Sequence, residues 1–320
     1  MQTLKLSYLW NPFFEETVIY HLIKKLSKKK IEITSPSKAD LLIIGPYNLH
    51  TYTRKIFNSI KKIIDLEKYF KNIDLLSLRL YQPLKIFYCS ENVQLDSYKA
   101  DYYISTNLGV HRYENKHLRF PHWKEHIDWS HEDITRDTNT GNARRFGSFY
   151  KIEDLMIPQG EEFLKKKNIC FFTTHLNEPR KSFYLNFSKN FRVDGYGKYF
   201  DKGIKDHNSS HYNKKDIMKN YAFNLCPENI IYPGNYTEKI PDSFIGKCLP
   251  ISWADNNINY EFNQKAFINL NDFLNFDLQE LFQSLRDESF LKKYTKEALL
   301  FQKPSLETES NFFEKILLNL

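Results

Sequence analysis

Short apolar stretches recur along the chain, and each ends in polar residues, glycine or proline. Residues 39–45, 85–90 and 167–173 are the clearest examples. Such runs are typical of strands buried on both faces of a parallel sheet. Between them, residues 15–29 and 54–76 carry apolar side chains at helical spacing. The alternation of strands and helices therefore predicts an α/β fold with parallel sheets.

The chain has 320 residues, which is enough for two domains that each bury a core. A second series of strands begins near residue 167, after a connecting segment at 151–159. We therefore predict an N-terminal domain over 1–155 and a C-terminal domain over 160–303. Within the second domain, apolar spacing predicts helices at residues 278–285 and 290–301. Residues 304–320 are predicted to form a tail helix that packs back on the N-terminal domain.

Charge and composition narrow the classes of partner. The net charge is +7, which suits anionic substrates, an anionic membrane surface or nucleic acid. The sequence contains no nucleic-acid-binding motif, so we expect no nucleic-acid partner, although salt-dependent binding stays an alternative hypothesis. The start MQTLKLSYLW lacks the regions of a signal peptide, and no run reaches the roughly 20 apolar residues of a membrane span. These features predict a cytoplasmic protein with peripheral membrane contact through a lipid-linked acceptor.

Four cysteines are far apart in the sequence and form no C-x-x-C pair. We predict that Cys89, Cys170, Cys226 and Cys248 are buried thiols and not ligands or disulfides.

Residues 221–273 carry the pattern of an anion site. An apolar strand at 222–226 leads through a polar loop to a predicted helix start at Thr237. The unpaired N–H groups and the dipole of such a helix favour a phosphate, and Lys239 adds a full positive charge. Glu228 and Glu238 can accept hydrogen bonds from sugar hydroxyls. This pattern predicts a nucleotide-sugar site, and a solvated first helical turn is the alternative interpretation.

Several motifs in this order resemble the alpha-1,3-fucosyltransferase family, glycosyltransferase family ten, in its bacterial form. They are C-x-E-N at 226–229, Y-T-E-K at 236–239, A-F-I-N-L-N-D-F at 266–273, P-R-x-x-F-Y at 179–184, V-D-x-Y-G-K at 193–198 and E-N-x-x-x-D-x-x-x-x-D-Y at 91–102.

The resemblance implies a GT-B fold, in which two Rossmann-like domains face a central cleft. It also implies inverting transfer of L-fucose from GDP-fucose to a saccharide hydroxyl, as an alpha-1,3 or alpha-1,4 transferase that decorates lipopolysaccharide or another glycan. The family's catalytic base maps to Glu91, and its diphosphate-binding arginine maps to Arg180. Asp96 and Asp101 match the acidic motif, but capping helices or shaping the loop is the role we expect of them. The donor-binding residues predicted in this way are Arg180, Tyr196, Glu228, Asn229, Tyr236, Thr237, Glu238 and Lys239.

No obligatory metal is expected, because the chain contains no D-x-D motif. His122, His126 and His131 are close in sequence, but H-x-x-x-H without a known carboxylate pattern is weak evidence for a metal site. Pro227 and the Asn235–Tyr236 pair depart from the family pattern, which leaves a different nucleotide sugar as an alternative. A noncatalytic saccharide-binding protein is a second alternative. The acceptor is expected to contact variable loops such as 45–55 and 107–150.

Overall fold

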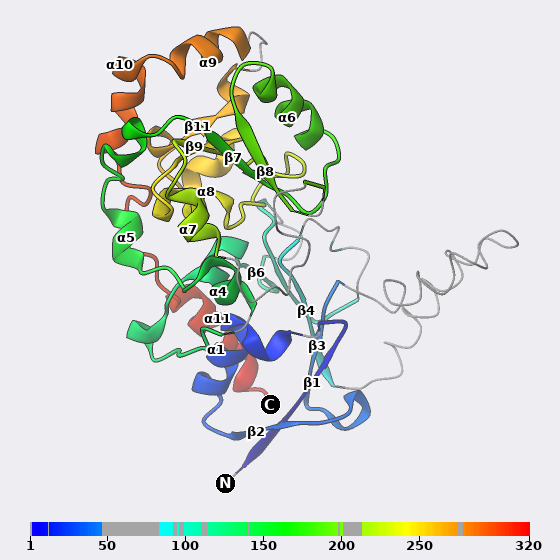
Figure 1. Cartoon of the computed structure of the whole chain (residues 1–320). Helices are drawn as coiled ribbons and strands as arrows, with labels where there is room; N and C mark the ends of the chain where they lie inside the picture. Colours follow the sequence, from blue (N-terminus) through cyan, green and yellow to red (C-terminus); the bar gives the residue numbers. More distant parts are fainter. Residues whose placement is uncertain are drawn as a thin grey trace, which may run out of the picture. The chain divides into compact units, whose positions relative to one another are not determined.

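The computed structural model describes residues 2–11, 13–46, 83–91, 95, 99–109, 114–139, 141–197, 199–200, 213–273 and 278–320. The predicted helix at 54–76 and most of the polar loop at 198–216 lie outside these residues. The chain divides into two compact units (Figure 1). The first comprises Met1–Pro121, Ser130–Arg136 and Ser305–Leu320, and the second comprises His122–Trp129 and Asp137–Pro304.

A six-stranded parallel sheet forms the centre of the first unit, in the order β2-β1-β3-β4-β5-β6. Its strands are β1 Thr3–Leu9, β2 Lys30–Ile33, β3 Leu41–Ile44, β4 Leu84–Cys89, β5 Tyr102–Ser105 and β6 His117–Arg119. Strand β3 is buried at every position, as its continuous apolar sequence predicts. The predicted strands at 39–45 and 85–90 are confirmed as β3 and β4.

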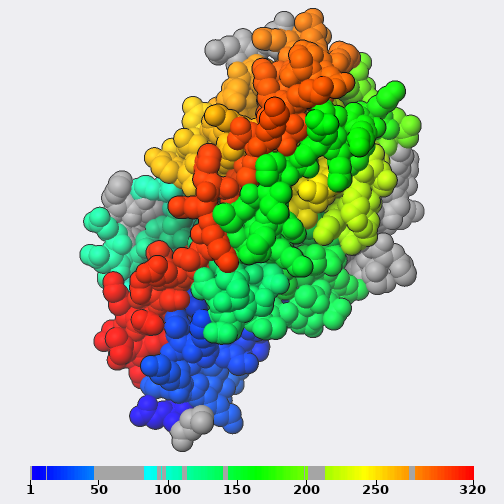
Figure 2. Space-filling model, turned by 90° about the vertical axis from the view of Figure 1, so that its left-hand side faces the viewer, coloured from blue at the N-terminus to red at the C-terminus, as the bar shows by residue number. Residues whose placement is uncertain are grey.

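Helix α1, Val18–Leu26, is capped by Thr17, whose side-chain oxygen accepts a hydrogen bond of 3.1 Å from the Tyr20 N–H. Its apolar face is buried, as the spacing predicts. The C-terminal helix α11, Glu307–Leu317, packs against α1, and Figure 2 shows the C-terminal residues beside the N-terminal ones. The C-terminal segment thus belongs to the first unit. The described residues of this unit also form the 3₁₀ helices η1 Phe14–Glu16, η2 Pro36–Lys38 and η7 Ser130–Glu132.

The second unit is built on a five-stranded parallel sheet in the order β11-β10-β9-β7-β8. Its strands are β7 Ile169–Phe172, β8 Val193–Tyr196, β9 Phe223–Leu225, β10 Leu249–Ser252 and β11 Ile268–Asn269. Its helices are α4 Gly141–Phe146, α5 Ile152–Met156, α6 Arg180–Ser188, α7 Lys214–Met218, α8 Lys239–Ile245, α9 Leu278–Ser284 and α10 Glu288–Leu291. The 3₁₀ helices are η6 His122–His126, η8 Glu162–Lys165, η9 Asn256–Tyr260, η10 Gln264–Ala266, η11 Leu270–Phe273 and η12 Lys292–Lys296.

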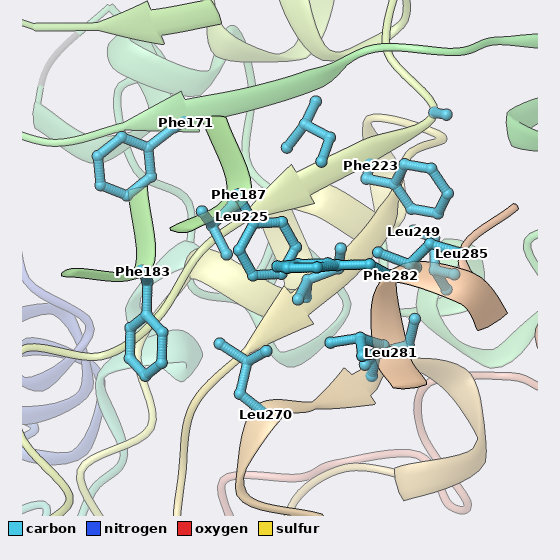
Figure 3. Packing of buried hydrophobic residues seen from close by; sticks show 14 of the residues in the cluster. Phe171, Phe183, Phe187, Phe223, Leu225, Leu249, Leu270, Leu281, Phe282 and Leu285 are labelled. Atoms are coloured by element: carbon cyan, nitrogen blue, oxygen red, sulfur yellow. The ribbon is translucent and has the colours of Figure 1, made fainter. Parts of the chain in front are cut away.

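The second unit has three layers, because β7 alternates between two buried faces. Phe171 faces a cluster that includes Phe187 of α6 and Phe282 of α9, whose rings meet edge to face at 5.1 Å (Figure 3). Cys170, the preceding residue, belongs to a separate cluster with Met218 of α7. Side chains of neighbouring strand residues point to opposite faces, so α6 and α9 cover one face of the sheet and α7 covers the other.

Two helix boundaries differ from the predictions. Helix α8 begins at Lys239, two residues after the predicted start at Thr237, whose N–H donates to the Glu228 side chain. The helix predicted at 290–301 ends at Lys296 in η12. Residues 155–160 belong to the second unit, in which the N–H groups of Leu299 and Leu300 both donate to the Leu155 carbonyl at 3.0 Å.

The four cysteines are all buried and unpaired, as predicted. None of the helices in the described ranges combines the length and the apolar character that a membrane crossing requires.

Candidate functional site

The order of strands in the second unit locates a binding edge. Strand β8 pairs with one edge of β7, and the next strand in the sequence, β9, pairs with the opposite edge of β7. The strand order therefore reverses at β7. In open parallel sheets, ligands bind beyond the carboxyl ends of strands at such a reversal. Thr173 follows β7 at this edge, and residues 226–228 follow β9.

Arg180 bridges these two strand ends from the first position of α6. Its Nε donates to the Pro227 carbonyl and its guanidinium donates to Thr173 Oγ1, both at 3.3 Å. Within the part of the chain that the structure describes, these are its only protein acceptors, so three of its five N–H donors have no protein partner. Burial lowers the pKa of Arg180, and the fields of Glu228 and Glu238 oppose that effect. A buried guanidinium with unused donors is suited to bind a diphosphate.

Glu228 organises the start of α8. Its Oε1 accepts from the Thr237 N–H at 3.2 Å and from the Thr237 hydroxyl at 2.7 Å. Its Oε2 accepts from Lys239 Nζ at 2.6 Å, and Lys239 also donates to Thr237 Oγ1 at 2.7 Å. Glu228 is 5% exposed, so its two oxygens are engaged inside the protein. It therefore fixes the position of the Lys239 ammonium, which is a different role from the predicted contact with sugar hydroxyls.

Glu238 is the residue immediately before α8, and its two oxygens face different neighbours. Oε1 is 3.6 Å from Lys214 Nζ, and Oε2 is 3.8 Å from His122 Nε2. Burial acts to raise the pKa of Glu238, but Lys239, Lys214 and two histidines outweigh it and hold that pKa well below the usual range. Glu238 is thus ionised at neutral pH and able to accept hydrogen bonds.

A buried network beneath Glu238 was not predicted. Lys214, the first residue of α7, contacts Asp242 Oδ2 at 2.9 Å, and the Tyr150 hydroxyl donates to Asp242 Oδ1. Asp242 is 1% exposed, and burial raises its pKa against the opposing charge of Lys214. The i, i+4 spacing of Glu238 and Asp242 indicates a shared helix face. The sequence contains no signal that brings Lys214 or Tyr150 to that face.

Tyr196 lies at the carboxyl end of β8, one strand away from the reversal. Its hydroxyl is 2.5 Å from that of Tyr221, and its ring stacks on Phe172 at 4.9 Å. The next residue, Gly197, has a φ of +127°, and a Cβ there would contact the Thr173 carbonyl oxygen. The predicted V-D-x-Y-G-K turn therefore holds the end of β8 against the end of β7, where Arg180 binds.

Two further predicted donor residues have different surroundings. Tyr236 is 1% exposed, and its hydroxyl donates to Asp255 at 3.0 Å, so its side chain supports the loop from inside. Asn229 is exposed at the edge of the same loop.

Comparisons with known proteins identify a similar family and fold. The sequence profile of glycosyltransferase family 10 (fucosyltransferase), C-terminal part, matches residues 163–299. This match covers less than half of the chain. The chain is 28% identical over 211 residues to the alpha-(1,3)-fucosyltransferase FucT of Helicobacter pylori. It is 31% identical over 125 residues to the putative fucosyltransferase R654 of Acanthamoeba polyphaga mimivirus.

These matches cover 62% and 36% of the chain but only 43% and 21% of the two relatives. The chain therefore spans less than half the length of the curated relatives that it matches. A crystal structure of an alpha1,3-fucosyltransferase aligns over 99% of the chain and 91% of that protein, with a TM-score of 0.64 and 21% identity. Its complexes with GDP-fucose and GDP align with TM-scores of 0.62 and 0.64. The similarity confirms the predicted GT-B fold with two Rossmann-like units.

The segment that matches the family 10 profile contains all eight predicted donor residues, from Arg180 to Lys239. It does not include Glu91, which belongs to the first unit and lies two residues beyond the end of β4. The Glu91 N–H donates to Cys89 Sγ at 3.3 Å, and the side chain is exposed. Asn92 and Asp96 of the same motif lie outside the described residues. Asp101 accepts from the Lys85 N–H at 2.8 Å, so its side chain holds the start of β4.

His122 and His126 also precede the segment that matches the family 10 profile, in η6 of the second unit. One ring nitrogen of each and a carboxylate oxygen of Glu238 lie within 4.8 Å of one another. The sequence did not predict this cluster, because it contains no local pattern that pairs Glu238 with the two histidines. His131, the third histidine of the sequence motif, belongs to the first unit.

Proposed function

We propose that the protein is an inverting fucosyltransferase that transfers L-fucose from GDP-fucose to a saccharide hydroxyl. The observation that carries this proposal is the buried Arg180, with unused donors, at the strand reversal of the segment that matches the family 10 profile. The relatives named as fucosyltransferases and the related structure that binds GDP-fucose support the choice of donor.

The diphosphate of the donor would lie between Arg180 and the start of α8. Arg180 supplies the fork of N–H donors, and Lys239 supplies an ammonium that Glu228 holds in place at 2.6 Å. Both cations have little contact with water, which strengthens their attraction for an anion. The side chains of Arg180 and Lys239 therefore neutralise the charge that develops on the departing GDP.

Glu238 is the acceptor that we propose for hydroxyl groups of the donor. Its carboxylate stays ionised because Lys239 and Lys214 hold its pKa low, so it accepts hydrogen bonds throughout the neutral range. Hydrogen bonds between an ionised carboxylate and hydroxyls contribute more than neutral ones. This interaction would orient the sugar or the ribose above the sheet edge.

We propose Glu91 as the general base. The acceptor oxygen forms a bond to the anomeric carbon as the bond from that carbon to the GDP oxygen breaks, and the acceptor proton passes to the Glu91 carboxylate. Attack opposite to the leaving group inverts the anomeric configuration. The supporting observation is the exposed position of Glu91 beyond the carboxyl end of β4. The anomeric coupling of the product in a proton NMR spectrum tests inversion, because retention excludes direct displacement.

The acceptor that we propose is a lipid-linked saccharide, such as a lipopolysaccharide precursor. The net charge of +7 supports contact with an anionic lipid surface. Sedimentation with anionic vesicles, compared with neutral ones, tests this point, and equal recovery with both would argue for a water-borne acceptor.

Calorimetric titration of the purified chain with GDP and GDP-fucose tests the donor site. We expect Arg180→Ala to weaken both ligands at least about tenfold, because a hydrogen bond from a charged group contributes about 1.5–3 kcal/mol. Lys181→Ala is the matched control, since it removes the same charge from an exposed neighbouring position. Equal losses in the two variants would reject a specific role for Arg180. Binding of UDP-galactose in place of GDP-fucose would favour a different nucleotide sugar.

A further inference from the structure

Two imidazoles and one carboxylate converge beside α8. Helix η6 presents His122 and His126, whose ring centroids are 5.3 Å apart, and Glu238 approaches from the residue before α8. His126 is 5% exposed and stacks on Tyr150 at 5.6 Å, so packing fixes its ring. A preformed set of two nitrogens and one oxygen is a common ligand set for a transition metal.

The surrounding charges leave Glu238 available to such an ion. Glu228 is paired with Lys239 at 2.6 Å, and Asp242 is paired with Lys214 at 2.9 Å. Each of the two ammonium groups therefore has a closer carboxylate partner than Glu238. Glu238 directs Oε1 toward Lys214 and Oε2 toward His122, so the oxygen nearest the histidines is not the one that faces the lysine. The charged group beside His122 and His126 is therefore the Glu238 carboxylate.

The distance between His122 and Glu238 fits a bridging cation better than a direct hydrogen bond. His122 Nε2 and Glu238 Oε2 are 3.8 Å apart, which is beyond the usual hydrogen-bond range of about 2.7–3.2 Å. Two ligands that each lie about 2.0–2.1 Å from a tetrahedral zinc are about 3.4 Å apart. A small movement of either side chain would thus complete the coordination. The Nδ1 atom of His122 is buried and has no hydrogen-bond partner among the described residues.

We propose that His122, His126 and Glu238 form a binding site for Zn²⁺ or a chemically similar divalent transition metal. Imidazole nitrogens exclude magnesium and calcium as preferred occupants, because those ions select oxygen ligands. The His122 and Glu238 side chains are 24% and 19% exposed, so water can reach a fourth coordination position. Three protein ligands with one open position are typical of zinc sites that exchange a water or a substrate group.

Zinc titration of the untagged full chain, in competition with a chromophoric chelator, tests the proposal. We expect one zinc per chain, no competition by magnesium, and a visible d–d absorption band when cobalt replaces zinc. Changes to residues that only orient ligands weaken metal binding about 10–100-fold, so loss of a ligand should weaken it at least about tenfold. His122→Ala and Glu238→Gln should each show this loss, and His131→Ala, which removes an exposed histidine, should not.

Circular dichroism in the presence of EDTA establishes that each variant is folded. His126 is buried, so the His126→Ala variant could fail to fold. The test then depends on His122→Ala and Glu238→Gln, which change partly exposed side chains. Zinc affinity that is unchanged in both His122→Ala and Glu238→Gln, or equally reduced in His131→Ala, would overturn the proposal. The titration contains no nucleotide, so its failure would not bear on the proposed transferase function.

Discussion

Replacing Lys214 by methionine should destabilise the second unit strongly, because it leaves Asp242 buried without a cationic partner. Lys214 Nζ is 2.9 Å from Asp242 Oδ2, and the two side chains are 18% and 1% exposed. Removing one partner of a buried ion pair costs about 3–5 kcal/mol, more than the pair itself contributes, since the remaining charge is uncompensated. At about 2–4 °C per kcal/mol, the midpoint of thermal unfolding should fall by about 6–20 °C.

The pH dependence of this loss has a definite sign. Burial raises the pKa of Asp242 in the folded protein, and Lys214 opposes that rise. An acid whose folded pKa exceeds its unfolded value of about 3.9 destabilises the fold above that pH, because the unfolded chain ionises more readily. Without Lys214 the folded pKa rises further. The deficit of Lys214→Met relative to the parent protein should therefore be largest at high pH and shrink as the pH falls toward 4.

Lys219→Met is the matched control for the stability measurement. Lys219 pairs with Asp216 at 3.0 Å, a similar distance, but its side chain is 53% exposed and that of Asp216 is 63% exposed. Such a pair contributes about 0–1 kcal/mol. The double variant Lys214→Met with Asp242→Asn should recover much of the loss, because asparagine removes the buried charge and still accepts from Tyr150. Equal destabilisation by Lys214→Met and Lys219→Met, or a deficit that grows at low pH, would refute this reasoning.

Two further substitutions test the catalytic base and the turn at the donor site. Glu91→Gln should lower the rate of fucosyl transfer about 10²–10⁴-fold, while calorimetry should show an unchanged affinity for GDP-fucose. Glu32→Gln, an exposed control in the first unit, should change neither the rate nor the affinity. Full turnover in Glu91→Gln would exclude Glu91 as the base. Gly197→Ala should destabilise the protein by more than about 1 kcal/mol and weaken GDP binding, because the methyl group would displace the Thr173 carbonyl beside Arg180. Gly160→Ala is the control, because Gly160 also has a positive φ, +77°, but nothing lies near the new methyl group. Equal losses of stability and of GDP affinity in the two glycine variants would contradict a role for the contact with Thr173.

The sheets could be predicted from sequence because buried parallel strands are continuous apolar runs. Residues 39–45 and 167–173 became β3 and β7, with only their ends shortened. The first residue of α8 could not be predicted in this way, because apolar runs and spacing do not locate where a helix begins. In the structure α8 begins at Lys239, and the Thr237 N–H before it donates to Glu228 of the preceding loop.

The charges around the candidate site were recognised individually, but their pairing was not. Glu228 and Glu238 both lie near a predicted helix start, and from the sequence both were predicted to accept hydrogen bonds from sugar hydroxyls. In the structure Glu228 is engaged by Thr237 and Lys239, whereas Glu238 faces Lys214 and His122. Side-chain pairing of this kind depends on tertiary contacts between segments that are distant in sequence, and residue type alone does not contain that information.

The two proposals for Glu238 lead to competition between the metal and the nucleotide sugar. A zinc ion would bind Oε2, the oxygen that faces His122, and the remaining Oε1 is already near the Lys214 ammonium. Hydroxyl groups of the donor would then have no favourable acceptor on this side chain, because a metal-bound carboxylate has less negative charge to offer. Each ligand should therefore weaken the affinity for the other by the same factor, as linkage between two sites requires. A site that binds either a cation or a sugar through one carboxylate would make fucosyl transfer sensitive to free zinc.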